Sequence, residues 1–129
     1  PVTAAHFPLK KRPSNPCNRK LSDEVTNMQM KEYEFWFVVG SQFLYGPEVL
    51  EIVAARAKEM ADTMNKSGIL PCKVVYKVTA KTPEEISNVV KEANYQDKCA
   101  GLITWMHTFS PSKMWIDGLS KLQKPYCHL

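Results

Sequence analysis

The chain has 129 residues, of which 44% are hydrophobic and 23% charged; this fits one small globular domain and excludes fibrous or wholly disordered proteins. The sequence contains no run of about 18 apolar residues, so it predicts no membrane-spanning helix. The formal net charge of +4 points to an anionic partner such as nucleic acid only if the charge lies on the folded part.

Residues 1–27 carry most of this charge. They hold five basic and two acidic residues, whereas residues 28–129 hold twelve basic and eleven acidic residues, a net charge of only +1. Four of the nine prolines also lie in residues 1–27, with no helix or strand period. We therefore predict a disordered or extraneous basic, proline-rich head, followed by one partial α/β domain in residues 28–129. A basic arm that binds polyanions is the alternative, but we expect neither a nucleic acid nor a membrane as partner.

Regular elements are predicted from residue 33 onward. Residues 33–39 (YEFWFVV) form a nearly continuous apolar run, which is typical of a strand buried on both faces of a parallel sheet. Residues 47–66 begin with proline and place apolar side chains at i, i+3 and i+4, so they predict an amphipathic helix that Gly68 is suited to end. Residues 72–78 predict the second strand.

The remaining elements continue the alternation of strand and helix. Thr82 and Glu85 have the spacing of a capping box, in which each side chain accepts a hydrogen bond from the backbone of the other, and a helix follows. Residues 99–106 predict a third strand, residues 110–111 (Ser-Pro) the start of a third helix, and residues 125–129 a further strand. This order, with short connections, predicts a parallel, doubly wound α/β sheet.

Ligands of open α/β sheets bind beyond the carboxyl ends of the strands, and the first such loop spans residues 40–46 (GSQFLYG). Gln42 and Tyr45 stand where a dinucleotide-binding loop needs glycines, and no GK[ST] motif is present, so the loop predicts neither site. A carboxamide and a phenol suit the hydroxyl groups of a neutral polyol, because each can donate and accept. The alternative is that Ser41 caps the turn and Tyr45 only packs.

The cysteines and the second loop allow fewer conclusions. Cys17, Cys72, Cys99 and Cys127 form no CxxC motif and no zinc spacing with histidine. We expect three buried thiols in strands, one thiol in the head and, without a secretory signal, a reducing cytoplasmic location. His107, which follows the third strand, is either a hydrogen-bonded structural residue or a group for proton transfer or ligand contact. Its pairing with Cys99 or Cys127 as base and nucleophile is the less favoured alternative.

Three stretches resemble the N-terminal region of the L-arabinose isomerase family: residues 34–48 (EFWFVVGSQFLYGPE), 70–73 (LPCK) and 93–129 (ANYQDKCAGLITWMHTFSPSKMWIDGLSKLQKPYCHL). The resemblance runs in unbroken order over residues 31–129. It implies a flavodoxin-like, fucose isomerase-type α/β domain, truncated within the fold, that forms the N-terminal part of an aldose–ketose isomerase. The alternative is a freestanding flavodoxin-like module that binds a small ligand.

The resemblance also implies a chemistry and its distribution. The family converts L-arabinose to L-ribulose in L-arabinose catabolism and uses a divalent metal, usually Mn²⁺, to polarise substrate oxygens while a carboxylate moves the proton. The catalytic and metal-binding residues lie downstream, so we expect none in this chain and no activity from it alone. The substrate-binding residues implied are Gln42, Leu44 and Tyr45, which would face the active site of a neighbouring subunit in a homo-oligomer, a hexamer. Neither Phe43 nor His107 receives a role.

Overall fold

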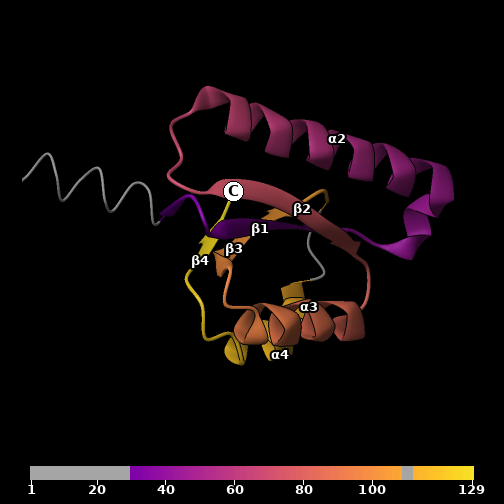
Figure 1. The fold of residues 1–129 in the computed structure, drawn as a ribbon. Helices are drawn as coiled ribbons and strands as arrows, with labels where there is room; N and C mark the ends of the chain where they lie inside the picture. Colours follow the sequence, from indigo (N-terminus) through magenta and orange to yellow (C-terminus); the bar gives the residue numbers. More distant parts are fainter. Residues whose placement is uncertain (1–29, 109–111) are drawn as a thin grey trace, which may run out of the picture.

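The computed structural model describes residues 30–108 and 112–129, which form a central sheet with helices on both sides (Figure 1). The residues 1–27 predicted as a head lie outside the described part. The elements in chain order are β1 (Glu34–Gly40), the 3₁₀ turn η1 (Phe43–Tyr45), α2 (Gly46–Ser67), β2 (Lys73–Ala80), α3 (Pro83–Tyr95), β3 (Cys99–Met106), α4 (Ser112–Ser120) and β4 (Tyr126–His128).

All strand pairs are parallel, and the strand order is β2-β1-β3-β4. Helix α2 covers one face of the sheet, and α3 and α4 cover the other (Figure 1). The order corresponds to the first four positions of the flavodoxin-like arrangement. The expected class, a parallel doubly wound α/β sheet, is therefore confirmed.

Strand β1 is buried on both faces, which explains its continuous apolar sequence. Alternate side chains enter two separate cores. The core under α3 and α4 contains Trp36, Val38, Ile86, Val90, Leu102 and Trp115, and the core under α2 contains Phe37, Val39, Val53, Ala57, Ala61 and Val74. The two central strands are therefore held from both sides.

The predicted first helix, residues 47–66, is confirmed to within one residue at each end, since α2 spans Gly46–Ser67. Pro47 lies in the first turn of α2, and Gly68 ends the helix in the left-handed conformation, with a φ of 65°. Glycine adopts this conformation without the steric cost that a Cβ atom brings. Among the described residues, no helix is both long and apolar enough to cross a bilayer.

The capping box of α3 forms only in half. The Thr82 hydroxyl accepts from the backbone N–H of Glu85 at 3.2 Å, as expected. The Glu85 carboxylate, however, accepts from the backbone N–H of Lys81 at 2.6 Å instead of that of Thr82. The Lys81 ammonium also lies 3.3 Å from this carboxylate, so two attractions draw the Glu85 side chain toward Lys81.

Two further expectations are corrected at the strands. β2 extends to Ala80, two residues beyond the prediction, because its ladder with β1 continues to the Gly40–Ala80 pair. Cys72 and Cys99 are buried, but Cys127 is exposed, because β4 is an outer strand whose three residues are all exposed. The expected helix start at residues 110–111 lies outside the described residues.

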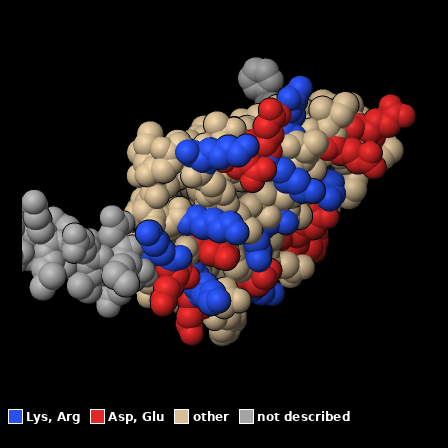
Figure 2. All heavy atoms as spheres, turned by 45° about the horizontal axis from the view of Figure 1, so that its top comes forward, with Lys and Arg blue, Asp and Glu red and all other residues tan. Residues whose placement is uncertain are grey.

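The surface carries charges of both signs. On the face shown in Figure 2, basic and acidic side chains lie interspersed. A polyanion-binding surface would instead gather basic side chains on one face. This distribution agrees with the near-neutral charge counted for residues 28–129.

Candidate functional site

The candidate site lies at the carboxyl ends of β1 and β3, which are neighbours in the sheet. The chain leaves β1 toward α2 on one face, whereas it leaves β3 toward α4 on the other (Figure 1). Neighbouring strands that diverge in this way create the crevice in which doubly wound folds bind ligands. The loop residues 41–45 and the side chain of His107 stand at this point.

Backbone contacts join three strand ends at the site. The His107 N–H donates to the Gly40 carbonyl at 3.0 Å, and the Ser41 N–H donates to the Ala80 carbonyl at 3.0 Å. A side chain at Gly40 would collide with the Met106 sulfur and would approach the Trp115 indole to 3.2 Å. A larger residue at position 40 would therefore require the Met106 side chain to move.

Side chains connect the two loops. The hydroxyl oxygen of the fully buried Ser41 lies 3.4 Å from His107 Nδ1. The Tyr45 ring stands edge-on to the His107 ring, with a centroid separation of 5.5 Å and an interplanar angle of 82°. The Trp105 ring lies 6.2 Å from His107 in a similar edge-on arrangement.

The predicted substrate-binding residues share one turn but differ in exposure. Gln42 precedes η1 and is half-buried, as is Tyr45 at its end. Leu44 is 73% exposed and Phe43 is 62% exposed. The alternative that Ser41 caps this turn is wrong, because Gln42 occupies the cap position, no side chain caps it, and the Ser41 hydroxyl faces His107.

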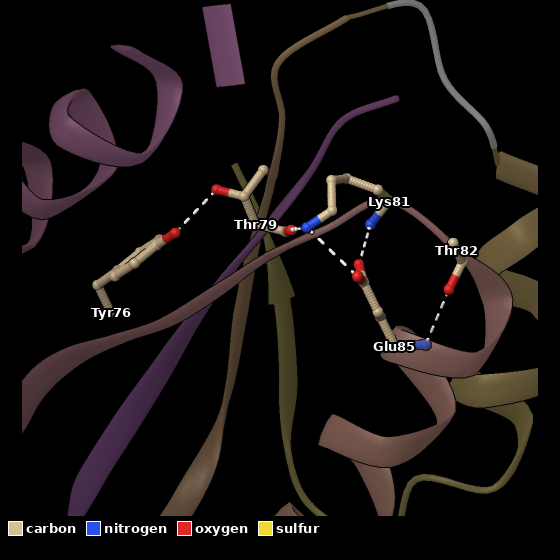
Figure 3. A network of polar contacts seen from close by, with 5 residues as sticks. All are labelled: Tyr76, Thr79, Lys81, Thr82 and Glu85. Atoms are coloured by element: carbon tan, nitrogen blue, oxygen red, sulfur yellow. Dashed lines mark hydrogen bonds and ion pairs between the residues drawn. The ribbon is translucent and has the colours of Figure 1, made fainter. Parts of the chain in front are cut away.

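A polar network fixes the end of β2 beside this turn (Figure 3). The Tyr76 and Thr79 hydroxyl groups lie 2.9 Å apart, and the Lys81 ammonium donates to the Thr79 carbonyl at 3.2 Å. The same ammonium pairs with Glu85 and lies 5.5 Å from the centre of the Phe43 ring. Sequence reasoning missed Lys81, because only the pairing of β2 with β1 brings it next to the turn.

Neither Cys99 nor Cys127 contacts His107. His107 and Cys99 stand at opposite ends of β3, roughly 25 Å apart at about 3.3 Å per residue, so their pairing is excluded. Cys127 pairs with Ile103 in the sheet, four residues short of His107. Within residues 30–108 and 112–129, no group of three or more His, Cys, Asp and Glu side chains is arranged to hold a metal ion.

A cavity of about 610 Å³ lies at the opposite edge of the sheet, among charged residues at the amino ends of the strands. Its lining comprises Lys31, Glu32, Tyr33, Glu34, Lys73, Asp97 and Lys98. This cavity is not the candidate ligand site, because doubly wound sheets bind ligands at the carboxyl ends of their strands.

Fold and site together define a doubly wound α/β domain with hydroxyl, amide and imidazole groups at its switch point. The chain belongs to the family described as the L-arabinose isomerase N-terminal domain, whose model matches residues 29–129. The resemblance seen in the sequence is thereby confirmed.

Individual relatives agree with this assignment. The chain is 57% identical over 102 residues to L-arabinose isomerase 1 of Clostridium acetobutylicum, with 79% of this chain and 21% of the relative covered. It is 58% identical over 102 residues to the L-arabinose isomerase of Lactiplantibacillus plantarum, covering 79% and 22%, and 55% identical over 93 residues to that of Klebsiella pneumoniae, covering 72% and 19%. The chain thus spans about a fifth of the length of these relatives.

Proposed function

We propose that this chain supplies the N-terminal part of an L-arabinose isomerase, an intramolecular oxidoreductase that converts the aldose L-arabinose to the ketose L-ribulose. The observation that carries the proposal is the family match over residues 29–129, together with identity at more than half of the 102 aligned residues to proteins named L-arabinose isomerase. Residues 28–129 act as one domain, and residues 1–27 play no part in the reaction.

The part played by this domain is sugar binding. Gln42 and Tyr45 each carry a group that donates and accepts hydrogen bonds, which matches the hydroxyl groups of a pentose. Leu44 adds an apolar contact with the carbon skeleton. In this proposal the enzyme is a cytoplasmic homo-oligomer, a hexamer, and the turn lies at a boundary with a neighbouring subunit. The exposure of Leu44 supports this position of the turn.

The metal of the proposed reaction is Mn²⁺. The described residues do not fit a metal ion, since no suitable cluster of His, Cys, Asp and Glu occurs among residues 30–108 and 112–129. The family resemblance implies that the ligands and the proton-transferring groups lie in other parts of the enzyme, so we expect the 129-residue chain alone to be inactive.

The test is an assay of the complete gene product that contains this sequence, with L-arabinose and MnCl₂, beside the isolated 129-residue chain. We expect the complete protein to form L-ribulose and the isolated chain to form none. Sugar binding by the isolated chain, with no turnover by the complete protein, would instead favour the small-ligand module.

A matched pair of variants tests the site. Replacing Gln42 by Leu removes the carboxamide and should raise KM for L-arabinose about three- to tenfold, the effect of one lost neutral hydrogen bond. Replacing Gln96 by Leu, an exposed position at the end of α3, is the control and should leave KM unchanged. An unchanged KM for Q42L would refute the sugar-binding role of the turn.

A further inference from the structure

His107 is the residue through which the two loops of the switch point contact each other. Its backbone N–H binds the Gly40 carbonyl, its Nδ1 lies 3.4 Å from the Ser41 hydroxyl oxygen, and its ring stands edge-on to Tyr45. His107 therefore touches the end of β1, the residue after it, and the last residue of the turn. The ring itself is backed by Trp105 at 6.2 Å.

The turn that His107 contacts has little packing of its own. None of the three residues of η1 is buried, and Phe43 and Leu44 are mostly exposed. A three-residue 3₁₀ turn of this kind is weakly constrained by its own backbone bonds. The position of the Tyr45 ring therefore depends on what it packs against, and His107 provides an edge-on aromatic contact of the kind that fixes ring orientation.

We propose that His107 is a positioning residue for sugar binding, which holds Tyr45 through its ring and Ser41 through its Nδ1. The proposal rests on the function proposed above, since it concerns the same turn. Its Nδ1 is directed to a fully buried hydroxyl, and its ring makes edge-on contacts with Tyr45 and with Trp105. This placement suits support of the turn.

Three replacements of His107 in the complete gene product separate the two contacts. His107→Phe keeps the aromatic ring and loses Nδ1, His107→Asn keeps a hydrogen-bonding group near Nδ1 and loses the ring, and His107→Ala loses both. The control is His128→Ala, because His128 binds the Thr104 hydroxyl at 2.9 Å on the outer strand. Thermal melting of every variant identifies any variant that fails to fold. If His107→Ala fails to fold, the Phe and Asn variants carry the test.

A positioning role predicts a split between the kinetic constants. We expect His107→Ala to raise KM for L-arabinose about tenfold while kcat stays within about twofold, as expected when a residue supports binding rather than the chemical step. His107→Phe should bring KM back to within about threefold of the starting protein, and His128→Ala should leave both constants unchanged. A fall in kcat of tenfold or more in both His107→Ala and His107→Phe would overturn the proposal in favour of proton transfer, and an unchanged KM in His107→Ala would overturn it outright.

A spectroscopic measurement makes the proposal independent of isomerase activity. ¹⁹F NMR of the complete gene product labelled with 3-fluorotyrosine reports on its tyrosines, five of which lie in this chain, and the Tyr45 line is assigned by Tyr45→Phe. His107→Ala should move the Tyr45 line, because the ring that faces it is lost, whereas His128→Ala should leave it in place. If the complete protein shows no isomerase activity, a Tyr45 line unmoved by His107→Ala refutes the positioning role separately from the proposed function.

Discussion

The two outer strands of the sheet, β2 and β4, differ in length, in exposure and in the bonding of their backbone groups. β2 has eight residues and packs under α2. The Asn65 side chain clamps the backbone of Val74: its Nδ2 donates to the Val74 carbonyl at 2.9 Å, and its Oδ1 accepts from the Val74 N–H at 2.7 Å. β4 has three residues, all exposed. On that side, the comparable clamp of Asn94 holds residues 121 and 123, ahead of the strand.

This difference shows which side of the sheet is closed. Asn65 bonds the outward backbone groups of Val74, so another strand cannot pair with β2 at that residue. The β4 side carries no such clamp on the strand itself within the described residues. The candidate site lies between the two, on β1 and β3, and a larger protein can extend the sheet beside β4 without disturbing it.

Thiol labelling gives the largest expected difference between the two sides. Cys72, just before β2, is buried, whereas Cys127 in β4 is exposed, and burial raises the pKa of the Cys72 and Cys99 thiols. In a Cys17→Ser chain, iodoacetamide should modify Cys127 at least about a hundredfold faster than the other two, because they react only after local opening. Mass spectrometry of timed samples measures the rates, and equal rates would contradict the burial.

Removal of the β2 clamp should have the next largest effect. Asn65→Ala leaves the Val74 N–H and carbonyl without this partner and should lower the free energy of unfolding by about 1–3 kcal/mol. Urea unfolding measures the loss. The control is Asn88→Ala at an exposed position of α3, which should change the free energy of unfolding by less than about 0.5 kcal/mol. If Asn88→Ala lowers the free energy of unfolding as much as Asn65→Ala does, the loss in Asn65→Ala does not come from the clamp.

The Thr82 cap of α3, which follows β2, should contribute less to the free energy of unfolding. Thr82→Ala removes the hydroxyl that accepts from the Glu85 N–H and should cost about 1 kcal/mol. Thr63→Ala on α2 serves as the comparison, since Thr63 only bonds back to the Glu59 carbonyl at an exposed position. We expect the control to be neutral or slightly stabilising, because alanine favours the helix. If Thr82→Ala is neutral too, the half-formed capping box does not stabilise α3.

The smallest effect is expected for a surface ion pair that precedes β4. Lys121 Nζ lies 2.8 Å from the Asp117 carboxylate, but both side chains are more than 60% exposed. Lys121→Ala should therefore lower the free energy of unfolding by no more than about 0.5 kcal/mol. Urea unfolding at low and high salt checks this, and a loss above about 1 kcal/mol that salt does not reduce would contradict it.

Local sequence patterns were sufficient for most of the fold. The apolar run before Gly40, the proline-led helix that ends at Gly68 and the third strand were all found from period and composition, because burial on both faces and helix caps leave direct marks on neighbouring residues. The exposure of Cys127 was not found, since a strand at the edge and a strand in the centre of a parallel sheet can have the same local sequence.

The site divides in the same manner. The amino-acid sequence by itself determined the family, the carboxyl-end loops and the turn with Gln42, Leu44 and Tyr45, because each is a contiguous segment. Only the tertiary structure decided that His107 meets Ser41 and Tyr45, that Lys81 lies beside Phe43, and that Asn65 closes β2. Most of these contacts join residues far apart in sequence, which come together only when the parallel strands pair.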